Sequence, residues 1–158
     1  MEQTYIDIMI QSLDKKIKVL DEIMGLNAIQ SNQLEDENVP VEEFDKIVEK
    51  KAQCIEQLDL LDSGFDKLYD KVANELKLHK ETYASKIKTM QNQIRLITDR
   101  SMEIQVQEAR NKELMIRKFA QIKESARNVR TSSKAATQYY KNMMQLNYVA
   151  PQFMDNKK

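Results

Sequence analysis

Glycine and proline are almost missing from this sequence, and that scarcity limits what the chain can fold into. The 158 residues include two glycines and two prolines, and neither type occurs between Phe65 and Asn147. A sheet needs a turn after each short strand, and such turns depend largely on these residues. Glu, Lys, Gln, Leu, Ile and Met are abundant instead, and they lose little side-chain freedom in a helix. We therefore expect an all-α protein, an elongated antiparallel three-helix bundle or coiled coil with a long C-terminal helix.

Apolar residues recur at alternating spacings of three and four, which places them on one face of each expected helix. The first helix is expected over 4–34, and Pro40 suits the first turn of the second. A short turn is expected at 62–64, with a continuous kinked helix as the alternative, and the third helix then runs to about residue 147. Polar residues occupy some positions on the apolar faces, and these are Asn27, Lys51, Glu108 and Asn111.

The expected lengths leave the end of the third helix uncovered. At about 1.5 Å per residue, the three helices would measure about 46, 32 and 125 Å, so neither earlier helix should reach beyond Ile104. The polar run at 107–112 falls near that point. We therefore expect an N-terminal helical bundle over 1–106, a partner-binding helical extension over 107–150 and a flexible tail over 151–158.

The apolar face of that extension is the candidate binding site. It must fold back, pair with a second copy or bind another protein, and ordinary core is the simplest alternative. Methionine adapts to many packing partners, which suits a surface that accepts another protein's helix. The candidate partner-binding residues are Met115, Phe119, Ile122, Ala126, Val129, Tyr139, Tyr140, Met143 and Met144.

Charge is divided unevenly along the chain, although the net charge is zero. From Arg110 onward there are 11 Lys and Arg against 3 Asp and Glu, so the first 109 residues hold the opposite excess. A nucleic-acid site should gather its basic residues on one face, whereas these are spread around the helix. A membrane-surface helix is less favoured still, because the apolar face is interrupted and lacks tryptophan. We expect neither nucleic-acid binding nor membrane insertion.

No pattern for catalysis, metal or cofactor binding stands out. The single histidine, His79, falls on an expected apolar face, and the single cysteine, Cys54, is most simply a small apolar residue. The two glycines are isolated, so no loop is available to cradle phosphate. We expect no enzyme activity and no cofactor. The lone cysteine, the absence of a long apolar run and a start unlike a secretion signal favour the cytoplasm.

The whole chain resembles the FlgN family of flagellar export chaperones, in the form found in clostridial relatives. The resemblance lies in "YIDIMIQSLDKKIKVLDEI", "LDLLDSGFDKLYDKVANEL", "SMEIQVQEARNKEL" and "SSKAATQYYKNMMQLNYVAPQFMDNKK". It implies a cytoplasmic helical chaperone that binds the C-terminal helical region of the flagellar hook-associated (junction) proteins. Such a chaperone prevents premature assembly and delivers its clients to the type III export gate, so gate and export-ATPase components are further expected partners. A self-associating structural coiled coil or adaptor is the alternative.

Overall fold

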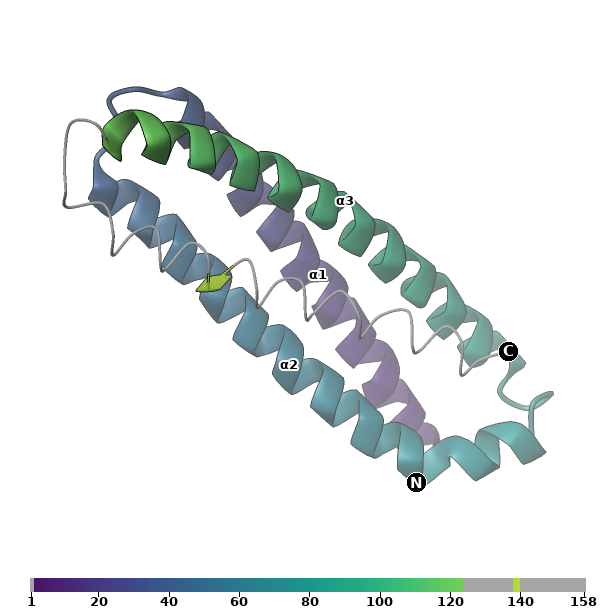
Figure 1. Ribbon diagram of the computed structural model, residues 1–158. Coiled ribbons are helices and arrows are strands. Elements are labelled where there is room, and N and C mark those ends of the chain that lie inside the picture. The colour runs from purple at the N-terminus through teal and green to yellow at the C-terminus, as the bar shows by residue number, and fades with distance from the viewer. Residues whose placement is uncertain (1, 124–137, 140–158) are drawn as a thin grey trace.

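The computed structural model describes residues 2–123, 138 and 139, and the continuous part forms three helices. Helix α1 spans Glu2–Glu35, α2 spans Val41–Leu78 and α3 spans Ala84–Lys123. The helices lie side by side over their common length (Figure 1). The expected all-α three-helix bundle is confirmed.

The connection between α1 and α2 follows the sequence prediction. Pro40 is the N-cap residue of α2, with φ −62°, and Glu42 and Glu43 occupy its first turn. Proline suits this position because the first backbone N–H groups of a helix have no intrahelical acceptor, and the two acids favour the positive end of the helix dipole.

The predicted second turn is wrong. Helix α2 continues without a break through 62–64, and the chain reverses at 79–83 instead. His79, expected on an apolar helix face, is the C-cap residue of α2, and its exposed side chain lies 3.6 Å from the carboxylate of Glu75. The continuous helix left as the alternative at 62–64 is what forms, so the third helix begins at Ala84 rather than at Phe65.

Both glycines lie inside helices, where they cost stability. Gly25 and Gly64 are exposed, have no positive φ, and a Cβ built on either meets no atom within 4 Å. Alanine restricts the unfolded chain more than glycine and favours the helix by about 1 kcal/mol. We expect Gly25→Ala and Gly64→Ala each to raise the melting temperature by about 2–4 °C in a thermal melt followed by circular dichroism. A decrease at Gly64 would show that the continuous α2 is not the native conformation.

Helix α1 is the common partner of the other two. It packs closely along both α2 and α3, whereas the backbones of α2 and α3 approach each other much less. Helices α1 and α3 are parallel, because their hydrogen-bonded residues keep sequence separations of 79 to 85 along the whole pair. The contacts repeat every seven residues, as in a coiled coil. They join Asp7 to Lys86, Asp14 to Gln93 and Asp21 to Arg100.

The expectation that α3 outruns its cover after Ile104 is wrong over the described residues. The helices have similar lengths of 34, 38 and 40 residues, and α1 reaches the last turns of α3. There the Lys118 ammonium donates hydrogen bonds to the carbonyl oxygens of Gln33 and Asp36, at 3.1 and 2.6 Å. The last carbonyls of a helix lack intrahelical donors, and a cation there also favours the helix dipole. Lys118 therefore stabilises an α1 terminus that is itself rich in acids.

Candidate functional site: a buried polar layer

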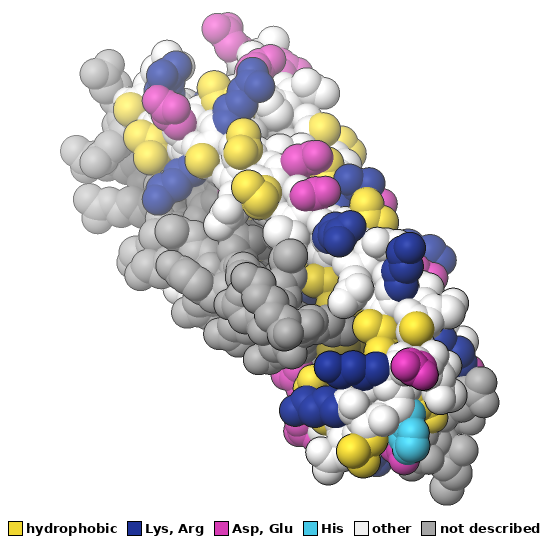
Figure 2. Space-filling view, turned by 90° about the vertical axis from the view of Figure 1, so that its right-hand side faces the viewer, with side chains coloured by type: hydrophobic (Ala, Val, Ile, Leu, Met, Phe, Trp, Pro, Cys, Tyr) yellow, Lys and Arg dark blue, Asp and Glu magenta, His cyan; other side chains and the backbone are white. Residues whose placement is uncertain are grey.

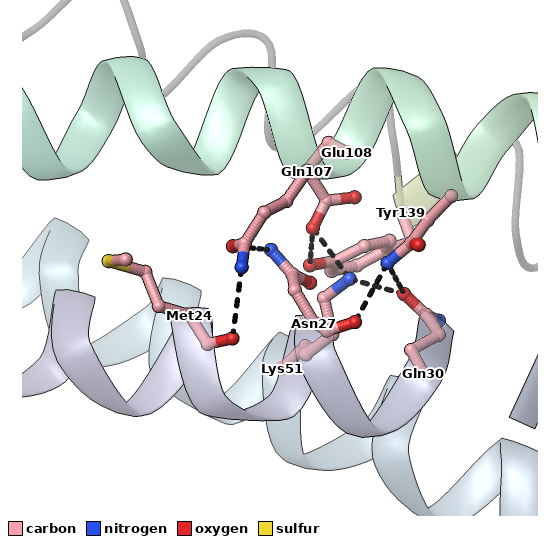
Figure 3. Close-up of polar contacts among 8 residues, drawn as sticks. Met24, Asn27, Gln30, Lys51, Gln107, Glu108 and Tyr139 are labelled. Atoms are coloured by element: carbon pink, nitrogen blue, oxygen red, sulfur yellow. Dashed lines mark hydrogen bonds and ion pairs between the residues drawn. The ribbon is translucent and has the colours of Figure 1, made fainter. Parts of the chain in front are cut away.

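A layer of polar side chains crosses the apolar core where the three helices meet (Figure 3). Each member is buried, and each helix contributes at least one. We call this group the polar layer. Its members are Asn27 and Gln30 of α1, Lys51 of α2, and Glu108 and Asn111 of α3, together with Tyr139.

Lys51 is the centre of the polar layer. Its side chain is completely buried, and its ammonium lies 2.6 Å from the Glu108 carboxylate and donates to Oε1 of Gln30 at 2.8 Å. Lys51 therefore joins α2 to both other helices. A buried charge needs such partners, because an isolated ammonium would lose its hydration without compensation.

Amide side chains fix how α3 sits on α1. Asn111 donates to the carbonyl oxygen of Asn27 at 3.0 Å, and Gln107 donates to that of Met24 at 3.3 Å. The Asn27 side chain in turn donates to Oε1 of Gln107 at 3.1 Å. If α3 shifted along α1, these side chains would lose their hydrogen-bond partners inside the bundle. The polar layer therefore favours one register of the two helices, as polar core residues do in coiled coils.

Burial outweighs the mutual attraction of the ion pair. Desolvation lowers the pKa of Lys51 from 10.5 to about 8, although the adjacent Glu108 carboxylate opposes the shift. Desolvation likewise raises the pKa of Glu108, against the effect of Lys51. Both groups thus move toward their neutral forms, which is the behaviour of an ion pair whose dehydration costs more than its contact returns.

Tyr139 closes the polar layer from outside the three helices. Its residue is 4% exposed, its hydroxyl donates to Oε1 of Glu108 at 3.0 Å, and its ring centroid lies 4.0 Å from the Lys51 ammonium. The ring face attracts the cation while the hydroxyl reaches the carboxylate, so one side chain contacts both members of the ion pair. A residue 31 positions beyond Glu108 therefore returns to the bundle.

A second buried ion pair lies farther along α1 and α2. The Lys16 ammonium is 2.6 Å from Oδ1 of Asp62, with side-chain exposures of 7% and 11%. Desolvation raises the pKa of Asp62, while Lys16 opposes the shift. Asp62 belongs to the turn that the sequence predicted at 62–64, but it lies inside α2 and faces the core.

The structure divides the sequence-predicted binding residues into three groups. Met115 is 3% exposed in the bundle core, contrary to the expectation that it is free for a partner, and Phe119 is half-buried against the same core. Tyr139 belongs to the polar layer. Ile122 lies in the last turn of α3. The predicted binding residues that lie outside the part of the chain that the structure describes are Ala126, Val129, Tyr140, Met143 and Met144.

Sequence reasoning missed the polar layer as a site, although its signal was present. Asn27, Lys51, Glu108 and Asn111 each sit at an apolar position of a helical repeat. Once the three helices are aligned, these four polar residues on apolar helix faces fall at the same height in the bundle, which indicates a polar layer. The wrong second turn prevented that alignment, because it shifted α3 relative to α1 and α2.

The remaining candidate group is Cys54. It is buried, and burial, with Glu22 nearby, raises the pKa of its thiol to about 11. The thiol is therefore protonated near neutral pH and is a poor nucleophile. This agrees with its expected role as a small apolar core residue.

Comparisons with known proteins do not assign this chain to a group. It matches no protein-family model, and neither the curated proteins nor the solved structures gave a match. Over the part of the chain that the structure describes, none of the helices combines the length and the apolar character that crossing a membrane requires.

Proposed function

We propose that this chain is an export chaperone of the FlgN type, which binds the C-terminal helical region of flagellar hook–filament junction proteins. It would act without catalysis, holding the client in the cytoplasm and delivering it to the type III export gate. The end-to-end resemblance of the sequence supports this proposal. The helical bundle is compatible with it, because the resemblance implies an all-helical protein.

The observation that carries the proposal is a contrast between the bundle surface and the C-terminal sequence. On the face in Figure 2, hydrophobic side chains are scattered between charged ones and form no broad patch. Scattered apolar residues are normal on a protein surface. The C-terminal sequence instead gathers Tyr, Met and Phe within 139–154. This concentration favours the C-terminal segment over that face as the place where a client helix binds.

Substitutions at two of the sequence-predicted binding residues, Val129 and Met143, test the proposal in the full-length protein. We expect Val129→Asp and Met143→Asp each to weaken binding of a junction-protein C-terminal fragment by about 10- to 150-fold, because each loses about 1.5–3 kcal/mol of apolar burial. Binding is measured by titration calorimetry. Leu60→Asp is the matched control, since Leu60 is 73% exposed on α2, and it should bind as the unmodified protein does.

Two outcomes would contradict the proposal. The unmodified protein could fail to bind the fragment, or the two substitutions could leave its affinity unchanged while circular dichroism shows intact helices. Either result would mean that the C-terminal segment does not bind the client.

A self-associating coiled coil is the second candidate, favoured by apolar side chains on the outer surface of α3. Met102 and Val106 are 60% and 70% exposed and four residues apart, so they share a helix face. A stable dimer in light scattering that Val106→Asp dissociates would favour this function.

A further inference from the structure

Tyr139 contacts α2 and α3 at the point where the Lys51–Glu108 ion pair joins these two helices. It reaches Lys51 of α2 through its ring and Glu108 of α3 through its hydroxyl (Figure 3). We call the surface formed by Lys51 and Glu108 the α2–α3 seam. Helix α1 packs closely on both helices, whereas the backbones of α2 and α3 approach each other little, and Tyr139 is a further residue that contacts both of them at the seam.

The chemistry of the seam suits a tyrosine. Its cation and anion lie 2.6 Å apart, and both side chains are almost fully buried, at 0% and 8% exposure. An aromatic face satisfies the cation, and a hydroxyl donor satisfies a carboxylate oxygen. Phenylalanine would supply only the first contact, and an aliphatic residue neither. Tyr139 is therefore held by specific contacts with the ion pair as well as by apolar burial.

We infer that the α2–α3 seam is a docking site for the chain's own C-terminal segment, with Tyr139 as its anchor. The inference rests on the proposed function in one respect, because the docked segment is the same one that we assign to client binding. Docking on the seam and binding of a client are then competing states of Tyr139. The apparent client affinity then equals the intrinsic affinity multiplied by the fraction of molecules in which Tyr139 is undocked.

The competition predicts that the Tyr139→Phe variant binds the client more tightly than the unmodified protein does. Phenylalanine keeps the apolar ring for a client but loses the hydrogen bond to Glu108. Hydrogen bonds to charged groups are among the stronger ones, so we expect the undocked fraction, and with it the client affinity, to rise by about tenfold. A Tyr139 that only contacts the client would give unchanged or weaker binding, which would overturn the competition.

Docking itself can be tested without any client, by fluorine NMR of the full chain. The protein has six tyrosines and is labelled with 3-fluorotyrosine, and the resonance that disappears in Tyr139→Phe is Tyr139. A soluble gadolinium chelate should broaden the Tyr139 signal less than those of half-buried Tyr69 and Tyr83. Equal or greater broadening of Tyr139 would overturn the docking site.

A double variant separates the seam from general burial. Lys51→Met/Glu108→Met removes both charged partners of Tyr139, and its resonance should become as accessible as those of half-buried tyrosines. Lys50→Met, at the neighbouring exposed lysine, is the matched control and should change nothing. Protection that survives the double variant would overturn the role of the ion pair. Failure of the unmodified protein to bind client, with Tyr139 protected, would instead reject the proposed function and leave the docking site standing.

Discussion

Replacing Lys51 with methionine is expected to lower the free energy of unfolding by about 3–5 kcal/mol, because it leaves Glu108 buried without its cation. The loss corresponds to a melting temperature lower by about 10 °C. Glu108→Met should cost a similar amount, since it leaves the Lys51 ammonium without its carboxylate. The measurement is urea unfolding followed by circular dichroism.

The double variant Lys51→Met/Glu108→Met should recover most of that loss. Methionine has a similar volume to both side chains, and apolar replacement of a whole buried ion pair is often neutral or stabilising. The remaining cost comes from the Tyr139 hydroxyl and Gln30, which lose one partner each, at about 1 kcal/mol per group. Lys50→Met is the control and should change stability by less than about 0.5 kcal/mol. Additive losses in the double variant would show that the two charges do not interact.

The same pair gives stability a defined pH dependence. The pKa of Lys51 is about 8 in the folded protein against 10.5 for the unperturbed side chain, so between these values the unfolded chain holds the proton more strongly. The neutral Lys51 side chain therefore contributes its full share to the free energy of unfolding above pH 10.5. This contribution is lost as the pH falls through about 8, where Lys51 takes up a proton in the folded protein. The unfolding free energy of the native chain, relative to the double variant, should rise over this interval by roughly 3 kcal/mol, as measured by urea unfolding at a series of pH values.

Alanine at position 62 is expected to destabilise the protein by about 3 kcal/mol, although alanine is the better helix former. Asp62→Ala removes the carboxylate that lies 2.6 Å from the buried Lys16 ammonium. Ser63→Ala is the matched control: Ser63 is the next residue in α2 but is exposed. There the gain in helix propensity should dominate, and stability should rise by a few tenths of a kcal/mol.

The measurement is chemical denaturation of both variants. Opposite changes in the free energy of unfolding at these adjacent positions of α2 would distinguish the effect of the buried ion pair from the effect of helix propensity. A stabilising Asp62→Ala would contradict the buried pair, because it would mean that Lys16 regains its hydration without cost. A destabilising Ser63→Ala would contradict the continuous α2.

The two predicted turns differ in how well local chemistry specified them. Pro40 cannot continue a preceding helix and suits the start of the next one, so the first turn was predictable without tertiary contacts. The second was misplaced because Asp62, Ser63 and Gly64 are turn residues by propensity. Burial of Asp62 against Lys16 overrides that preference, and the real turn at 79–83 contains neither glycine nor proline.

The candidate site was only partly predictable for a related reason. A polar residue on an apolar helix face is visible in the sequence, as at Lys51 and Glu108, but its partner is not. Whether such a residue interrupts the core or completes a polar layer depends on which residues of other helices lie at the same level. Tyr139 illustrates the same limit, since nothing local indicates that its ring meets Lys51.

The sequence by itself determined the all-α class, the first turn and the apolar faces of the helices, because backbone propensity and side-chain periodicity are local properties. Only the tertiary structure decided where α2 ends, how α3 aligns with α1 and which buried charges are paired. Those outcomes depend on desolvation, which a charged side chain experiences only when other helices surround it. The Lys51–Glu108 pair therefore acquires its shifted pKa values and its contact with Tyr139 only in the assembled bundle.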